Sequence, residues 1–317
     1  MNNTNLNKAR ANKFDEFYTT YEDIHKEMAS YVAYNPNVFR DKTILCPCDN
    51  PEKSNFTKYF LDHFEELGLR KLISSCISPN MHLSSPLFNG NAHGLFLIKE
   101  QGKTPHIGSL RSNGDFLSQE VTSFRNQADI IITNPPFSLF RRFFRWIRNK
   151  QFSIILPQTV VPHKYMLAQL KTNSVHISTN IPKAFILPNN APHSKYAYTI
   201  DNKTYVKLGN VLWFTNIESN SIPQPLKLNT MTYNIQNSKH KILRKKGYQH
   251  YDNYNAIDIP FSDSIPSDYN GFMCVPISFL TRCNLNQFEI IDAPKNILLN
   301  NKEPFQRILI RNKHHEK

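Results

Sequence analysis

Residues 128–140, ADIIITNPPFSLF, carry a run of isoleucines that leads directly into two consecutive prolines. Proline has no backbone N–H and disfavours the helical region for the residue before it, so Asn134 and Pro135 are both held extended. Residues 134–137 can therefore form neither a helix nor the middle of a strand. The apolar run predicts a buried strand, and the prolines predict a stiff loop where that strand ends.

Short apolar segments alternate with helical patterns along the first half of the chain. We expect buried strands at 42–46, 71–77, 128–133 and 151–157, amphipathic helices at 21–31, 55–68 and 138–150, and a hairpin within 78–113. Strands that are apolar throughout, rather than at every second residue, are typical of a parallel sheet covered on both faces. The sequence therefore predicts an α/β fold with a mostly parallel, twisted sheet and helices on both faces.

The 317 residues have room for one large domain or two. We expect a mobile basic arm at 1–12, a large α/β domain at 13–220 and a smaller accessory region at 221–317, with no linker to fix the second boundary. Residues 1–120 hold 13 Lys and Arg against 14 Asp and Glu, whereas residues 121–317 hold 25 against 11. This positive field in the later part favours a polyanionic partner.

The loop after the 128–133 strand presents acceptors, because Pro135 donates no hydrogen bond while its carbonyl and the Asn134 side-chain oxygen both accept. Phe137 adds a flat apolar face, and Pro136 stiffens the turn. Two acceptors beside an aromatic ring suit a planar amino group, such as that of a nucleobase, which becomes a nucleophile when its hydrogens are held. A base inside a duplex would first have to be flipped out. The alternative is a proline-rich strand end that carries no chemistry.

Several blocks along nearly the whole chain resemble one family. DEFYTTYEDI (15–24), CPCDNPEKSNFTKYF (46–60), TNPPFSLF (133–140), YDNYNAIDI (251–259) and DYNGFMCVPISFL (268–280) are similar to the EcoRI-type adenine-specific DNA modification methylases. The resemblance implies a Rossmann-like class I methyltransferase fold, S-adenosylmethionine as cofactor and double-stranded DNA as substrate. It also implies that Asn134, Pro135, Pro136 and Phe137 form the catalytic loop, that 13–220 binds cofactor and that 221–317 recognises DNA.

The same resemblance places cofactor contacts in three motifs. The candidates are Tyr18 and Thr19 in FYTT, Cys46, Asp49, Ser54, Asn55 and Phe56 in the loop after the first strand, and Asp115 and Phe116 in GDF. In such a motif the Asp115 carboxylate would accept the adenine amino group of the cofactor, and Phe116 would stack on it. The chain departs from the wider pattern in two ways: no glycine lies between residues 41 and 60, and no acidic residue follows the second strand to bind the ribose.

Two basic segments are candidate DNA contacts. We expect Arg141, Arg142 and Arg145 on the 138–150 helix, and Lys239, Lys241, Arg244, Lys245, Lys246 and Tyr251 in 239–254, to touch DNA. In each case the alternative is a solvated basic face beside an ordinary core.

The remaining features predict where the protein works. Five scattered cysteines predict reduced thiols, and Cys46-Pro47-Cys48 has no second Cys or His pair at zinc spacing, so we expect no metal. Without an apolar leader or an 18-residue apolar run, we expect a soluble cytoplasmic protein that associates with the nucleoid and not with membranes. We expect no obligate protein partner and a monomeric protein.

Taken with the loop chemistry, the resemblance implies a site-specific DNA adenine methyltransferase that methylates the 6-amino group of a flipped adenine, in a restriction-modification system. Two alternatives stay open: an RNA or protein-glutamine amino-methyltransferase, which the same loop could serve, and a non-catalytic DNA-binding relative.

Overall fold

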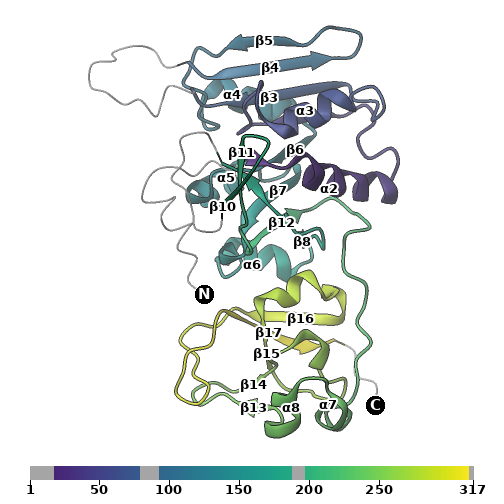
Figure 1. Ribbon diagram of the computed structural model, residues 1–317, viewed down its shortest axis with the longest axis vertical. Coiled ribbons are helices and arrows are strands. Elements are labelled where there is room, and N and C mark those ends of the chain that lie inside the picture. Colours follow the sequence, from purple (N-terminus) through teal and green to yellow (C-terminus); the bar gives the residue numbers. More distant parts are fainter. Residues whose placement is uncertain (1–17, 79–92, 188–196, 314–317) are drawn as a thin grey trace, which may run out of the picture. The chain divides into compact units, whose positions relative to one another are not determined.

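The computed structural model describes residues 18–78, 93–187 and 197–313 (Figure 1). The expected arm at 1–12 lies outside these ranges. By its internal contacts the chain divides into two compact units. The first contains the residues up to Pro157 together with Asn180–Ser221, and the second contains Gln158–Thr179 and the residues from Ile222 onward.

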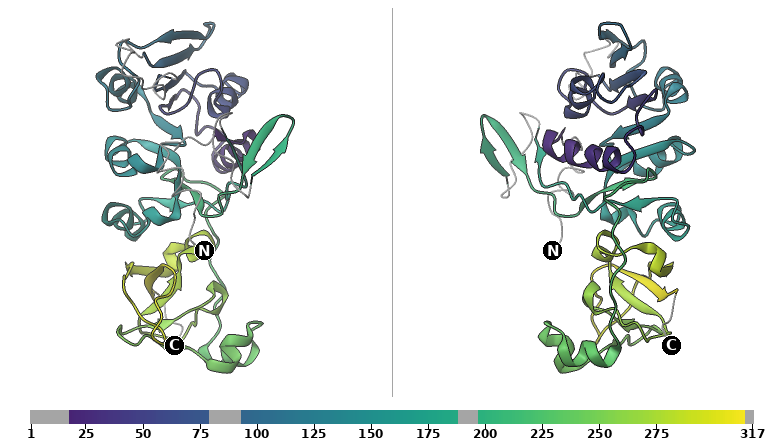
Figure 2. Two further views of the ribbon diagram at one scale, coloured as in Figure 1. Left: turned by 60° about the vertical axis from the view of Figure 1, so that its left-hand side comes forward. Right: turned by 90° about the vertical axis from the view of Figure 1, so that its right-hand side faces the viewer.

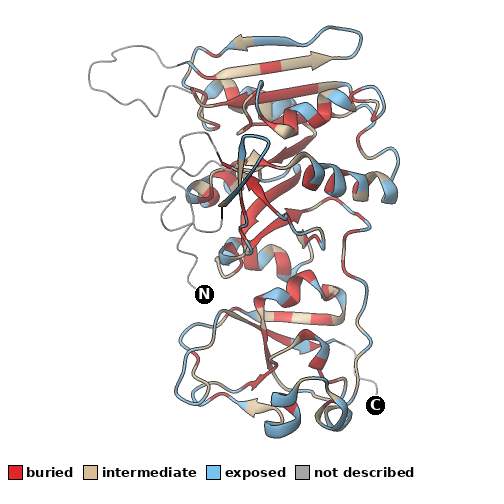
Figure 3. Ribbon diagram, in the orientation of Figure 1, coloured by how far each residue is buried: buried red, intermediate tan, exposed pale blue. Residues whose placement is uncertain are grey.

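The strands that the first unit contributes to the main sheet follow the order β5-β4-β3-β2-β6-β7-β12. These strands are β2 (Thr43–Cys46), β3 (Lys71–Cys76), β4 (Leu95–Glu100), β5 (His106–Ser109), β6 (Ile130–Thr133), β7 (Gln151–Pro157) and β12 (Val211–Thr215). All residues of β2, β6 and β12 are buried, as are all but the first of β7 (Figure 3). This agrees with the expectation of strands covered on both faces.

The four neighbouring strands β3, β2, β6 and β7 pair in parallel. The flanking strands β4, β5 and β12 pair antiparallel, so the expectation of a mostly parallel sheet describes only its centre. The link between β4 and β5 is the hairpin expected within 78–113, and it is too short for the crossover that parallel strands need.

Helices cover both faces of this sheet, with α2 and α3 on one side and α4 and α5 on the other (Figure 2). Their bounds are α2 (Tyr21–Tyr34), α3 (Asn55–Asp62), α4 (Gln119–Gln127) and α5 (Phe140–Trp146), the last preceded by the 3-10 turn η1 (Phe137–Leu139). Thr20, Ser54 and Ser118 cap α2, α3 and α4, each by accepting a backbone N–H. The helix expected over 55–68 ends at Asp62, and the chain turns back toward β3 through Gly68, whose φ is 62°.

A second, smaller sheet in the same unit has the order β1-β9-β11-β10. Its strands are β1 (Tyr18–Thr19), β9 (Phe185–Ile186), β10 (Ala197–Ile200) and β11 (Lys203–Val206), all paired antiparallel.

The second unit is built around a sheet of order β13-β14-β15-β17-β16. Its elements are η2 (Gln158–Val160), α6 (Lys164–Lys171), β8 (His176–Ile177), α7 (Met231–Asn237), α8 (Lys241–Lys246), β13 (Gln249–His250), β14 (Ile257–Asp258), η3 (Ser262–Ser264), β15 (Met273–Pro276), η4 (Ile277–Thr281), η5 (Leu285–Gln287), β16 (Phe288–Asp292) and β17 (Arg307–Asn312). Only β14 and β15 pair parallel in this sheet.

Candidate active site

Three predicted motifs meet at one edge of the main sheet. The loop of Asp49 follows β2, and the loop of Asn134 follows β6, which lies beside β2 in parallel. The loop of Asp115 contacts the end of β3, on the other side of β2, where Ser78 N donates to Asn113 O at 2.9 Å. Because parallel strands end at the same edge, the fold gathers all three loops at the place where open α/β sheets bind ligands.

Asp49 connects two of these loops through its carboxylate. Ser54 Oγ donates to Asp49 Oδ1 at 2.7 Å, and Thr133 Oγ1 donates to Asp49 Oδ2 at 2.6 Å. Asp49 is only 5% exposed, so these two bonds replace water that the carboxylate has lost. The side chain expected to hold cofactor therefore ties the first-strand loop to the residue that immediately precedes Asn134.

The rest of the first-strand loop is firmly packed. Asn55 Nδ2 donates to Thr19 O at 2.8 Å, which brings β1 to the start of α3. Phe56 is 1% exposed and packs edge-on against Trp213, with ring centroids 5.9 Å apart. Cys46 ends β2 with a fully buried thiol, and burial, reinforced by Asp49, raises its pKa well above its ordinary value. A ligand in this loop would thus meet backbone more readily than the side chains of Cys46 and Phe56.

The Thr19 hydroxyl is the clearest sign that a polar ligand fits here. Thr19 is 2% exposed, and its buried Oγ1 has no hydrogen-bond partner in the described part of the chain. Buried polar atoms are almost always satisfied, so an unsatisfied one at a site edge calls for a ligand or water. Tyr18, beside it in β1, is half-buried.

The Asp115 loop is shaped by a glycine. Gly114 has a φ of 83°, and a Cβ at this position would lie 2.2 Å from the carbonyl oxygen of Cys76. Asp115 itself is half-buried; its Oδ1 accepts from Leu117 N at 2.8 Å, and its Oδ2 accepts no hydrogen bond from the described residues. One carboxylate oxygen is therefore available to a ligand.

The Phe116 ring is not accessible for the stacking on the cofactor that we expected. It is 4% exposed and packs edge-to-face on Phe143 and Trp146 of α5, with centroids 5.1 and 5.5 Å away. Its ring packs the Asp115 loop against α5, the helix that follows the Asn134 loop. Phe116 therefore stabilises the positions of these two loops, and its ring is not open to a ligand.

The Asn134 loop consists of the three residues between β6 and η1. Asn134 and Pro136 are half-buried and Pro135 is buried, while Pro136 starts the 3-10 turn that leads into α5. Phe137 is 3% exposed, so its ring is covered in this conformation.

The basic candidates on α5 lie at the surface. Arg141, Arg142 and Arg145 are exposed, whereas Phe140 and Phe143 are buried as the helical spacing predicts. This arrangement is compatible both with phosphate contacts and with a solvated face.

The second basic segment lies on and before α8 in the second unit. Lys239 Nζ lies 2.8 Å from Asp263 Oδ2, and Arg244 donates to the carbonyl of Ser238. The remaining lysines are exposed and form no ion pair with any described residue: Lys241, Lys245 and Lys246.

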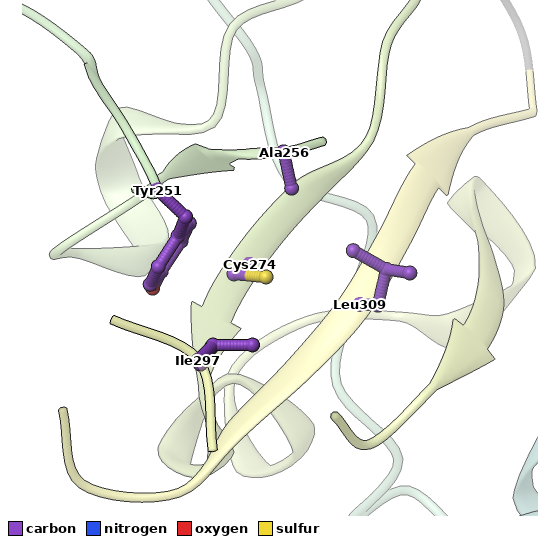
Figure 4. Close-up of a cluster of buried hydrophobic side chains, with 5 residues drawn as sticks. All are labelled: Tyr251, Ala256, Cys274, Ile297 and Leu309. Atoms are coloured by element: carbon purple, nitrogen blue, oxygen red, sulfur yellow. The ribbon is translucent and has the colours of Figure 1, made fainter. Parts of the chain in front are cut away.

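Tyr251 occupies a different environment from the one expected. It is 5% exposed within a core cluster that includes Cys274 and Leu309 (Figure 4). Its hydroxyl donates to Asp258 Oδ1 at 2.6 Å, and the same oxygen accepts from Arg307 Nε at 3.1 Å. A DNA contact by Tyr251 does not fit this placement, because the side chain is enclosed and its polar atom is already satisfied.

The sequence alone did not identify Thr133 and Gly114 as residues that position the loops of the candidate site. Thr133 is a polar residue that ends an otherwise apolar strand, which is the one signal that could have singled it out.

Among the described residues, no group of three or more His, Cys, Asp or Glu side chains is placed to hold a metal ion. The described helices are all too short or too polar to cross a membrane.

Comparison with known proteins identifies the family of the chain. The family model for the adenine-specific methyltransferase EcoRI matches residues 5–317. The type II methyltransferase M.EcoRI of Escherichia coli is 35% identical over 98% of this chain and 97% of its own length. M.MpnI of Mycoplasma pneumoniae and M.MgeORF184P of Mycoplasma genitalium are 33% and 31% identical, each over 92% of this chain and 86% of its own length. No solved structure gives a significant match.

The mixed α/β fold and these matches define a methyltransferase. More particularly, the chain belongs to the EcoRI family of adenine-specific methyltransferases, which confirms the resemblance inferred from the sequence. The prediction of a DNA-modifying enzyme rather than a non-catalytic relative is confirmed.

Proposed function

We propose that the protein transfers the methyl group of S-adenosylmethionine to the 6-amino group of an adenine that is flipped out of duplex DNA. The observation that carries the proposal is the bond between Asp49 and Thr133, which joins the expected cofactor loop to the expected catalytic loop. The parallel centre of the main sheet, with helices on both faces, supports a Rossmann-like class I arrangement for this unit.

Residues of three motifs would hold the cofactor. The unsatisfied Thr19 hydroxyl and the open Oδ2 of Asp115 fit a ligand rich in hydroxyl and amino groups. Backbone groups of the loop between Asp49 and Ser54 would complete the binding site. The cofactor supplies an electrophilic methyl group when bound.

Asn134 and Pro135 act on the adenine. The Asn134 side-chain oxygen and the Pro135 carbonyl accept the two hydrogens of the amino group, which turns the nitrogen lone pair toward the methyl group. As the carbon–nitrogen bond forms and the carbon–sulfur bond to the methyl group breaks, the thioether leaves with the electron pair. Positive charge then develops on the nitrogen, and the two acceptors stabilise it more than they stabilise the neutral amine. The nitrogen then loses one proton to solvent. Stacking of the base on Phe137 requires the side chains that cover this ring to move.

The exposed basic residues would hold the DNA. Arg141, Arg142 and Arg145 of α5 and the exposed lysines of α8 would neutralise phosphates, and the region from residue 221 onward would read the sequence. Such an enzyme protects host DNA within a restriction-modification system, as a monomer that works in the cytoplasm at the nucleoid.

Methyl transfer from labelled S-adenosylmethionine to duplex DNA, RNA and protein tests the proposal. We expect label in DNA only, recovered as N6-methyladenine after digestion to nucleosides. Label in RNA or in protein glutamine would favour the alternative amino-methyltransferases. Mapping of methylated adenines in DNA from cells that express the protein would then give the recognition sequence.

A further inference from the structure

The smaller sheet of the first unit has two unlike faces. Directly opposed residues of antiparallel strands share a face, and neighbours along a strand alternate between faces. Thr19, Phe185 and Val206 are opposed across β1, β9 and β11 and are at most 2% exposed. This face is packed against the body of the unit.

The other face carries a row that runs the width of the sheet. Tyr18 opposes Ile186, Ile186 opposes Tyr205, and Tyr205 opposes Tyr198. The first three are half-buried and Tyr198 is 38% exposed, so exposure increases from the candidate cofactor motif toward the outer strand.

The outer end of this row lies on the hairpin of β10 and β11, which stands away from the main sheet (Figure 2). Asp201 and Asn202 both have positive φ, of 47° and 58°, which is the backbone of a tight two-residue turn that matches strand twist. The hairpin is therefore a well-defined projection.

Its exposed face combines aromatic, aliphatic and basic groups. The rings of Tyr198 and Tyr205 stack at 5.5 Å with planes 15° apart, and Lys207 Nζ lies 5.9 Å from the centroid of Tyr198. Ile200, on the same face, is 53% exposed, and Lys203 opposes it. Residues 197–207 contain two lysines and a single carboxylate, that of Asp201.

We propose that this face, defined by Tyr198, Ile200, Lys203, Tyr205 and Lys207, binds DNA beside the flipped adenine, stacking on unpaired bases or sugars while its lysines neutralise phosphates. Aromatic rings interleaved with cations are the usual means of holding nucleic acid without reading its sequence. The positive charge favours a polyanion over a second copy of this basic chain. The inference rests on the proposed function and adds a DNA contact within the unit that carries the catalytic loop, in addition to the expected region from residue 221 onward.

The test compares two double variants with matched backbones. Tyr198→Ala with Tyr205→Ala removes both rings, whereas Tyr198→Phe with Tyr205→Phe keeps them. Each variant is titrated against a duplex that contains the mapped recognition sequence, with 2-aminopurine in place of the target adenine. Binding of S-adenosylmethionine is measured on the same preparations as a check of folding.

We expect the alanine pair to bind the duplex at least tenfold more weakly and to lose much of the 2-aminopurine signal, while the phenylalanine pair stays within threefold of wild type. Cofactor affinity stays unchanged in both. Should the alanine pair be misfolded, Lys203→Glu with Lys207→Glu replaces it, because both side chains are exposed. The expected result is then a similar loss of DNA affinity with intact cofactor binding.

Wild-type affinity and flipping in a folded variant would overturn this inference while leaving the proposed function intact. Failure of the wild-type protein to methylate DNA would instead overturn the proposed function itself. A wild-type dimer that the alanine pair dissociates, without a change in DNA affinity, would show that the face binds a second copy and would also overturn the inference.

Discussion

Thr133 donates a 2.6 Å hydrogen bond to the buried carboxylate of Asp49. The two residues belong to different loops of one sheet edge, and Thr133 is followed directly by Asn134. The second oxygen of Asp49 is held by Ser54, which caps α3. The Asp49 carboxylate therefore links the candidate cofactor loop to the residue that precedes the candidate amide.

Thr133→Val keeps the shape of the side chain but removes this donor. A buried carboxylate oxygen that loses its donor costs about 1–3 kcal/mol, and we expect the free energy of unfolding to fall by that amount. Without this hydrogen bond the end of β6 is held less firmly, and Asn134 is the next residue. We therefore expect Asn134 to be displaced and kcat to fall about tenfold or more. Urea unfolding and steady-state methylation measure the two effects, and Thr133→Ser, which restores a hydroxyl, should recover most of both. Unaltered kcat in the valine variant would contradict the positioning role.

Gly114→Ala should damage the Asp115 loop through a clash with the Cys76 carbonyl, 2.2 Å from the added Cβ. Gly102→Ala is a matched control, since Gly102 also has a positive φ, of 73°, but no atom lies within 4 Å of its added Cβ. Strain from the positive φ alone costs about 1 kcal/mol. We therefore expect calorimetry to show a cofactor affinity at least tenfold weaker for Gly114→Ala and unchanged for Gly102→Ala. Equal effects of the two substitutions would rule out the close approach as the cause.

Tyr251→Phe tests whether this residue belongs to the core. Loss of the hydroxyl that donates to Asp258 should lower the free energy of unfolding by about 1–2 kcal/mol at neutral pH and leave DNA affinity unchanged. Burial, together with Asp258, raises the pKa of Tyr251 in the folded protein. The resulting stability is fully present below the ordinary tyrosine pKa of about 10 and is lost as pH rises above it, so the phenylalanine variant should lose less stability between pH 9 and about 11. Weaker DNA binding at unchanged stability would instead restore Tyr251 as a DNA contact.

Lys245→Ala tests the basic face of α8. If Lys245 contacts one phosphate, its loss should reduce the magnitude of the negative slope of log affinity against log salt concentration by about 0.9. Lys103→Ala, in the turn between β4 and β5, removes one exposed charge elsewhere and should leave this slope unchanged. Fluorescence anisotropy of labelled duplex over a range of salt concentrations measures both, and an identical slope for the two variants would leave α8 as a solvated face.

Much of the central fold could be predicted because its signals are local. The isoleucines of 130–132 and the prolines after them specify a buried strand and a stiff loop without help from the rest of the chain. The pairing of Asp49 with Thr133 could not be predicted, because 84 residues separate them and only the sheet brings them together. The antiparallel edges of the sheet likewise depend on the length of connections, which apolar patterning does not report.

For Tyr251, the sequence predicted a surface position, whereas the side chain is buried. It lies in a polar stretch rich in Tyr, Asn and His, which favours a surface position. Its hydroxyl donates to Asp258 Oδ1. The same Asp258 oxygen accepts from Arg307, which comes 56 residues after Tyr251 in the chain. A polar neighbourhood in sequence therefore says little about burial when the hydrogen-bond partners are distant.

Asn134→Ala in a single-turnover methylation assay tests the central claim most directly. Wild-type protein and variant are each saturated with labelled S-adenosylmethionine and mixed with duplex carrying the mapped site, so that neither cofactor nor DNA affinity limits the rate. Loss of one transition-state acceptor should slow methyl transfer to adenine about 100-fold or more, with cofactor affinity unchanged. Equal single-turnover rates for the two proteins would contradict the account, because the amide oxygen of Asn134 would then have no part in the chemistry.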